Sequence, residues 1–175
     1  MWRDIMSYPM DWKTSRGPET INQCPESKLP LTVAEVMTRD VVTVSPHQSL
    51  SDAISLISAN HFHHIVVIDS SAKVVGVVSD RDILRAVART PDWHTYNMGQ
   101  VMTANPITVR PESPLLVAVS KMLAKRFNSL PVVGENGTLT GILTSTDVLW
   151  CYQKLTESMQ ARLEQIGFDK LSLSI

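Results

Sequence analysis

The sequence has little excess charge of either sign. Its 16 Lys and Arg residues nearly balance its 17 Asp and Glu residues, which leaves a net charge of −1. Proteins that bind nucleic acid through phosphate contacts carry a basic surface, so this balance argues against a nucleic-acid partner. The sequence also lacks the long apolar run of a membrane span or of a signal peptide. We therefore expect a cytoplasmic protein with no membrane partner.

Cysteine and glycine are scarce, and their spacing excludes several kinds of site. The two cysteines, Cys24 and Cys151, form no CxxC pair and stand in no zinc-site spacing with histidine. The seven glycines form neither a P-loop nor a GxGxxG motif. No GxSxG or HExxH motif occurs either. These absences predict reduced thiols and no intrinsic catalytic activity, so we expect that the protein is not an enzyme.

A gapless internal repeat organises the chain. Val36-Met37-Thr38 recurs as Val101-Met102-Thr103, and at this offset of 65 residues 36–84 align with 101–149. Fifteen of the 49 aligned positions are identical, and most others are conservative. Unrelated segments rarely match so well without a gap, so the sequence indicates a duplication.

Each copy predicts the order β-α-β-β-α. A short β-rich run precedes an apolar stripe at helical spacing, then two apolar runs separated by turn residues, then a second helix. The β-rich runs are Val41–Val44 and Ile107–Val109, the hairpins pair 65–68 with 74–78 and 130–133 with 139–143, and the second helices start at Ser79 and Thr144. We therefore expect an α/β (α+β) fold of two repeats packed about a pseudo-twofold axis, with ligand clefts at the seam.

The chain divides into four predicted parts. Residues 1–30 are a proline-rich N-terminal arm, 31–90 and 96–152 are the repeats, and 153–175 are a C-terminal helix extension and tail. Apolar residues from Val148 to Ile166 recur at helical spacing, and Gly167 follows as the expected C-cap. This stripe predicts either oligomer or partner contacts, or packing against the arm through Trp2 and Trp12.

The sharpest motif is Gly-x-x-Ser/Thr-x-x-Asp, which occurs once in each repeat. It comprises Gly76, Ser79 and Asp82 in the first copy, and Gly141, Thr144 and Asp147 in the second. The hydroxyl and the acid three residues later have the spacing of a helix capping box. The same helix N-terminus could bind a phosphate, and the carboxylate could hold ribose hydroxyls. Capping and nucleotide binding are compatible, so both interpretations stay open.

The doubled motif, the Val-Met-Thr segments and Leu130-Pro131-Val132-Val133 together resemble tandem CBS domains, also called a Bateman module. The resemblance covers about residues 31–152. It implies a regulatory sensor that binds AMP, ADP, ATP or S-adenosylmethionine in two clefts, pairs as a homodimer and regulates a protein partner. The alternative is a ligand-free dimeric scaffold or interaction module that regulates a partner enzyme or transporter, in which the motif only caps helices.

The resemblance also implies that each cleft mixes the two repeats. One cleft would combine Thr43, Phe62 and His63 with Thr144 and Asp147, and the other Thr108, Phe127 and Asn128 with Ser79, Arg81 and Asp82. In this scheme the two aspartates hold ribose hydroxyls, Ser79, Thr144 and Arg81 face phosphate, and the backbone around residues 42–43 and 107–108 frames adenine. The usual proline of the second strand is Val66 in copy one, which weakens the case for the first cleft.

Several other polar residues have two interpretations. His61, His63 and His64 cluster at a helix-to-strand junction, where a phosphate or purine contact or an exposed loop is favoured over a metal site. Lys125 and Arg126 could add positive potential at a cleft, but a solvated helix end is the favoured interpretation.

Overall fold

The computed structural model describes residues 31–60 and 63–165 of the chain. The predicted N-terminal arm, His61, Phe62 and the tail that includes Ile166 and Gly167 lie outside the described residues. The helices and strands, in order, are η2 Val33–Glu35, β1 Thr43–Val44, α1 Leu50–Asn60, β2 His64–Ile68, β3 Val74–Ser79, α2 Asp80–Arg89, η3 Trp93–Thr95, α3 Met98–Val101, β4 Thr103–Ala104, α4 Leu115–Lys125, β5 Ser129–Val133, β6 Leu139–Thr144 and α5 Ser145–Gln165.

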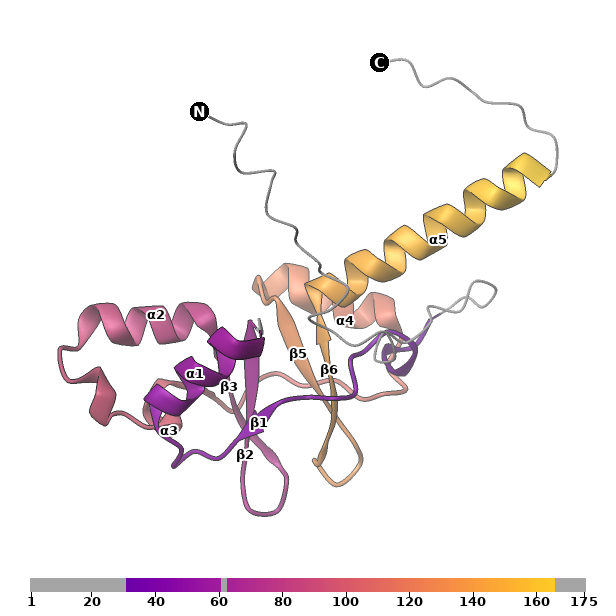
Figure 1. Cartoon of the computed structure of the whole chain (residues 1–175). Helices are drawn as coiled ribbons and strands as arrows, with labels where there is room; N and C mark the ends of the chain where they lie inside the picture. The colour runs from indigo at the N-terminus through magenta and orange to yellow at the C-terminus, as the bar shows by residue number, and fades with distance from the viewer. Residues whose placement is uncertain (1–30, 61–62, 166–175) are drawn as a thin grey trace, which may run out of the picture.

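The mixed α+β fold follows the duplicated order (Figure 1). β2 and β3 form one antiparallel hairpin and β5 and β6 form the other, at equivalent registers. The first helix of the first repeat begins at Leu50, where the Ser49 hydroxyl accepts the Asp52 N–H at 3.1 Å. α2 ends at Arg89, just before the Thr90-Pro91 pair, because proline does not continue a helix. The hairpins and second helices therefore confirm the predicted order.

The short first strands differ from the prediction. Only Thr43–Val44 of the first run forms a strand, and the second run makes a single parallel bridge, Val109 to Val132. One cause is chemical: Val66 donates its N–H to the Val42 carbonyl at 3.4 Å, whereas the equivalent Pro131 has no N–H. The second repeat therefore loses one hydrogen bond of this ladder.

Each repeat pairs its opening segment with the hairpin of the other repeat. Thr38 and Ile142 exchange two backbone hydrogen bonds of 2.9 Å each, and β4 pairs Thr103 with Val77. These two pairings are equivalent under the 65-residue offset. The exchange ties the repeats together through backbone bonds, and it brings the Val-Met-Thr segments against the strands that end in the Gly-x-x-Ser/Thr-x-x-Asp motifs.

Two apolar clusters form the core, one for each repeat's hairpin. Leu50, Ile65, Val67 and Val78 are fully buried in one cluster, and Leu130, Val132 and Leu143 are fully buried in the other. Met37 of the first repeat belongs to the second cluster. Each hairpin thus buries its apolar face against its own helices and against the other repeat's opening segment.

Candidate ligand cleft

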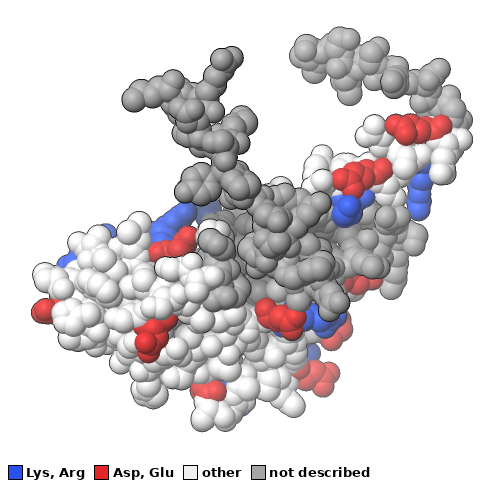
Figure 2. Space-filling view, in the orientation of Figure 1, with Lys and Arg blue, Asp and Glu red and all other residues white. Residues whose placement is uncertain are grey.

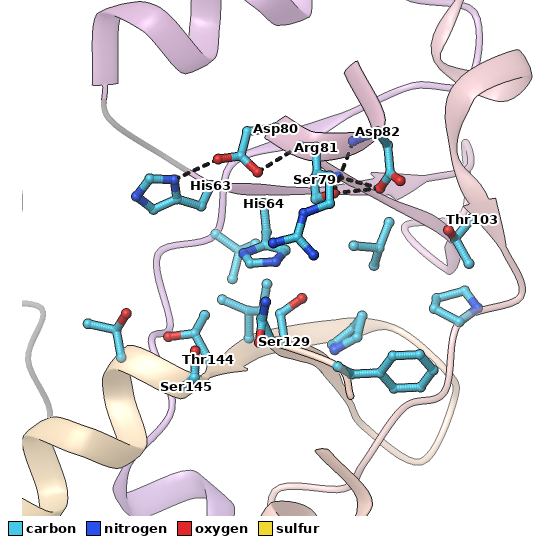
Figure 3. Close-up of a pocket in the computed structure, with 18 of the residues that line it drawn as sticks. His63, His64, Ser79, Asp80, Arg81, Asp82, Thr103, Ser129, Thr144 and Ser145 are labelled. Atoms are coloured by element: carbon cyan, nitrogen blue, oxygen red, sulfur yellow. Dashed lines mark hydrogen bonds and ion pairs between the residues drawn. The ribbon is translucent and has the colours of Figure 1, made fainter. Parts of the chain in front are cut away.

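A cleft of about 940 Å³ lies between the repeats (Figure 3). Both repeats contribute the polar, charged and apolar residues that line it: Thr38, Asp40, Val41, Val42, His63, His64, Val77, Ser79, Asp80, Arg81, Asp82, Arg85, Thr103, Asn105, Pro106, Ile107, Arg126, Phe127, Asn128, Ser129, Pro131, Ile142, Thr144, Ser145 and Thr146. His63, Thr144 and Ser145 lie toward one end of the cleft, and Asp82 and Thr103 lie toward the other (Figure 3). The size is that of a small-molecule site.

Capping boxes fix the start of both second helices at the cleft. The Ser79 hydroxyl accepts the Asp82 N–H at 3.2 Å, and Asp82 accepts the Ser79 N–H at 3.0 Å and its hydroxyl at 2.6 Å. Thr144 and Asp147 repeat the pattern at 3.2, 2.7 and 2.6 Å. The predicted capping role is therefore confirmed, and the helix N-termini are held at the cleft wall.

The two motif aspartates have different surroundings. Asp147 is buried, with 8% of its surface exposed, and its second oxygen accepts the Thr38 hydroxyl at 3.0 Å. The Asp82 side chain is 23% exposed, and its second oxygen pairs with Arg85 at 3.1 Å. Arg85 is itself mostly exposed, so this ion pair is weak. Asp82 is accordingly the carboxylate that a ligand can reach with less rearrangement.

A histidine pair lies beside the start of α2. His63 Nδ1 is 3.0 Å from an Asp80 carboxylate oxygen, and this hydrogen bond is the main cause that lowers the pKa of Asp80. Burial is the main cause that lowers the pKa of His64. The charges of His63 and Arg81 act in the same direction, and those of Asp80 and Asp82 oppose it. The lowered pKa keeps the His64 imidazole uncharged at neutral pH, in the middle of the cleft (Figure 3).

Three arginines line the cleft: Arg81, Arg85 and Arg126. Arg81 extends from the start of α2 toward Ser129 on the opposite wall (Figure 3). Arg126 is the C-cap of α4 in the left-handed conformation, with φ of 56°, which glycine usually occupies. The Phe127 N–H then closes the helix end on the Met122 carbonyl at 2.9 Å. Arg126 is thus an exposed helix end, as favoured from the sequence, and it also lines the cleft.

The structure brings seven of the eleven predicted site residues to the cleft wall: His63, Ser79, Arg81, Asp82, Phe127, Asn128 and Thr144. Thr43 and Thr108 do not line the cleft, whereas the preceding residues Val42 and Ile107 do. Asp147 lies behind Thr144, and Phe62 is outside the described residues.

Sequence reasoning missed Arg85, although the sequence held a signal for it. Arg85 follows Asp82 by three residues on a predicted helix, so the two side chains share a face. The described residues contain no group of three or more His, Cys, Asp or Glu side chains placed to hold a metal ion. In that same part of the chain, no helix is long and apolar enough to cross a membrane.

Comparisons with known proteins show a family and solved structures that this chain resembles. A family model described as CBS domain matches residues 33–89 and 98–154. The crystal structure of CBSX2 in complex with AMP is 34% identical and has a TM-score of 0.65, covering 71% of this chain and 98% of that chain. CBSX2 is a CBS-pair protein from Arabidopsis thaliana.

Two further relatives belong to larger proteins. The cytosolic domain of the Mg²⁺ channel MgtE, in complex with ATP, is 25% identical with a TM-score of 0.59, covering 67% of this chain and 47% of that chain. A homoserine O-acetyltransferase from Methanohalobium evestigatum is 30% identical over 116 residues, which are 66% of this chain. The chain spans only 23% of that enzyme's length, so the match says nothing about acetyl transfer.

Proposed function

Because the chain belongs to the CBS domain family, we propose that it is a regulatory module that binds an adenosyl ligand in the cleft between its two repeats. The observation that carries this proposal is the joint lining of one cleft by Ser79 and Asp82 of one repeat and Thr144 of the other. The AMP complex of CBSX2 and the ATP complex of the MgtE domain support the ligand class. S-adenosylmethionine stays in the candidate set from the sequence resemblance.

The chemistry of the cleft fits such a ligand. Helix N-termini present N–H groups and a positive dipole end to a phosphate. Asp82 could accept ribose hydroxyls, as acids do in dinucleotide sites. The Ile107 backbone offers a carbonyl group to a purine, and the Val42 and Ile107 side chains offer apolar surface. A ligand that touches both repeats would favour one relative arrangement of them, by no more than its differential affinity for the two arrangements.

The exposed face of α5 favours a second copy of the chain as the protein partner. Leu149, Tyr152, Met159 and Leu163 are each more than half exposed. Together with Thr156, these four residues recur at alternating spacings of three and four, as in a coiled-coil seam. A separate stripe beside this seam, which includes Val148 and Leu155, packs on the core. Beyond Leu155 no described residue of α5 is buried, and α5 projects away from the body (Figure 1).

A projecting segment of about ten residues is too short to be a stable isolated helix. The positions that flank the seam carry no acidic residue: Gln153 and Gln160 lie on one side and Arg162 on the other. Two copies that pair through the seam therefore meet little repulsion between like charges. Figure 2 shows acidic and basic side chains on the exposed part of α5, where they are solvated. We propose that two α5 helices pair through the seam and make the chain a homodimer.

The test of the ligand is a thermal-shift panel on the whole chain with AMP, ADP, ATP, S-adenosylmethionine and NAD, and with GTP as the base-specificity control. A site-specific ligand at 100 times its Kd should stabilise the protein by about 2.7 kcal/mol. A stabilisation by adenosyl compounds that GTP does not give would support the proposal. No shift with any adenosyl compound at millimolar concentration would contradict it. That result would favour the scaffold alternative, since both capping boxes are complete without a ligand.

A further inference from the structure

The two halves of the cleft are equivalent under the 65-residue offset but unequal in chemistry. The first half-cleft is formed by residues 38–42, His63 and the start of α5. The second half-cleft is formed by residues 103–107, residues 126–129 and the start of α2. If both halves took the same ligand, their charges and free polar groups should match. They differ in three respects.

The cations lie in the second half-cleft. Arg81 and Arg85 from α2 and Arg126 from the end of α4 line it. The positions equivalent to Arg81 and Arg85 in the other repeat are Thr146 and Trp150, and the position equivalent to Arg126 is His61, which lies outside the described residues. Among its described lining residues, the first half-cleft contains no arginine or lysine, and it places Asp40 where the second half-cleft has the neutral Asn105. The second half-cleft in turn places Asp80, which pairs with His63, where the first has the neutral Ser145.

The backbone acceptors also differ. The Val66 N–H bonds the Val42 carbonyl in the first half-cleft. Pro131 has no N–H, so the Ile107 carbonyl in the second half-cleft receives no such bond, and no other described group donates to it. Ile107 is 40% exposed and lines the cleft. A purine amino group therefore finds a free carbonyl acceptor at Ile107 and an occupied one at Val42.

The third difference is the availability of the motif carboxylates. Both oxygens of Asp147 accept protein hydrogen bonds, one of them from Thr38 of the other repeat, in a buried position. Asp82 exposes more of its surface, and the partner of its second oxygen is the mostly exposed Arg85. A ligand hydroxyl can replace that exposed ion pair at little cost. Replacing the buried Thr38 contact would leave a polar group unpaired.

We infer that the cleft is one-sided: it takes one nucleoside polyphosphate per chain, with the base at Ile107 and the phosphates at Arg81 and Arg126 in the second half-cleft. This deepens the proposed function and rests on it. Phosphate oxygens form charge-assisted hydrogen bonds with arginine, so affinity should rise with each added phosphate. S-adenosylmethionine, which carries a positive sulfonium instead of phosphates, should bind more weakly than ATP.

The test is titration calorimetry of the whole chain in Mg²⁺-free buffer with adenosine, AMP, ADP, ATP and S-adenosylmethionine. We expect affinity to increase from adenosine to ATP, with one ATP bound per chain. Arg126→Gln should weaken ATP binding about tenfold or more and leave adenosine binding within about twofold. Arg126→Lys keeps the charge and should retain most of the ATP affinity.

Lys125→Gln is the matched control. Lys125 is exposed, adjacent to Arg126 and absent from the cleft lining, so the same loss of charge should change ATP affinity less than about twofold. Circular dichroism melts show whether each variant is folded.

The outcomes separate the two levels of the proposal. Equal affinities for adenosine and ATP, tighter binding of S-adenosylmethionine than of ATP, or two ATP per chain would overturn the one-sided cleft and leave the proposed function standing. Equal effects of Arg126→Gln and Lys125→Gln on ATP binding would also overturn it, since the cation at the cleft would then have no specific role. If none of the five compounds binds, the proposed function fails and the one-sided cleft fails with it.

Discussion

Replacing Gly141 by alanine should loosen the exchange of segments between the repeats. An added Cβ at Gly141 would lie 2.7 Å from the Met37 sulfur and 2.9 Å from the Thr38 carbonyl oxygen. The sulfur is on a flexible side chain and can move, but the Thr38 backbone is held by its two hydrogen bonds to Ile142. The substitution therefore has to overpack this contact or break the backbone pairing.

The expected loss is a few kcal/mol. Overpacking typically costs about 1–3 kcal/mol, and each lost backbone hydrogen bond costs about 1 kcal/mol net. The entropic benefit of alanine over glycine in the unfolded chain offsets about 0.4–1 kcal/mol of this. We expect Gly141→Ala to destabilise the fold by about 2–3 kcal/mol, which lowers Tm by roughly 5–10 °C for a chain of this size.

Gly134→Ala is the matched control for this prediction. A Cβ there meets Thr140 and Thr138 at 3.5 and 3.6 Å, which is ordinary contact, and Gly134 is not among the residues with positive φ. Its unfolding free energy should stay within about 1 kcal/mol of the parent. Urea denaturation followed by circular dichroism measures both variants.

A double-mutant cycle with Met37→Ala identifies the cause. Met37 supplies two of the three atoms nearest the added Cβ. The double variant should therefore be more stable than the sum of the two single effects predicts. If Gly141→Ala is as stable as Gly134→Ala, or if its effect is simply additive with Met37→Ala, the contact between the two repeat motifs does not limit stability.

Three further predictions concern the cleft and α5. Asp147→Ala should destabilise the fold by about 2–4 kcal/mol in urea melts, because it removes a buried acceptor that bonds several donors. Asp82→Ala should cost only about 1 kcal/mol, as for a lost helix cap. Equal losses in the two variants would contradict the difference between the two aspartates. Because burial lowers the pKa of His64, the unfolded state binds more protons than the folded state, and the free energy of unfolding should fall as pH drops below about 6.5. His64→Gln should therefore flatten the profile of Tm against pH between pH 5 and 7, although the neighbouring carboxylates oppose the shift. A profile unchanged by the substitution would refute this prediction. Leu163→Glu should shift the chain from dimer to monomer in light scattering, while Ala161→Glu on the opposite side of α5 should not; a dimer in both variants would exclude the seam.

The predicted order of elements needed only local patterns and the repeat. Alternating and helical apolar spacing placed the hairpins and second helices, because burial of one face imposes these periods on any chain. The Ser/Thr-x-x-Asp spacing likewise indicated the capping boxes, since a cap is a contact between residues three apart. The bridge at Val109 was harder to predict, because strand length there depends on whether the partner across the ladder is valine or proline.

The candidate site was predicted only in part. Arg81, Asp82 and Phe127 reach the cleft because their motifs place them at element ends, which pattern alone can locate. Thr43 and Thr108 do not line the described cleft, whereas their neighbours Val42 and Ile107 do, because pairing with the rest of the sheet decides which residues of a short strand face it. Their role in ligand binding stays a prediction.

The sequence by itself determined the duplication, the order of elements within each repeat and the residue types at the helix starts, because each of these is written in local spacing. Only the tertiary structure decided that Met37 and Thr38 pack on the hairpin of the other repeat, since that exchange joins residues about 100 positions apart. The folded chain also places the Thr38 hydroxyl on the buried Asp147, whereas Asp82 stays partly exposed and pairs with Arg85. Two motifs with the same spacing thereby acquire different chemistry, because solvent access and long-range partners belong to the folded chain and to no local pattern.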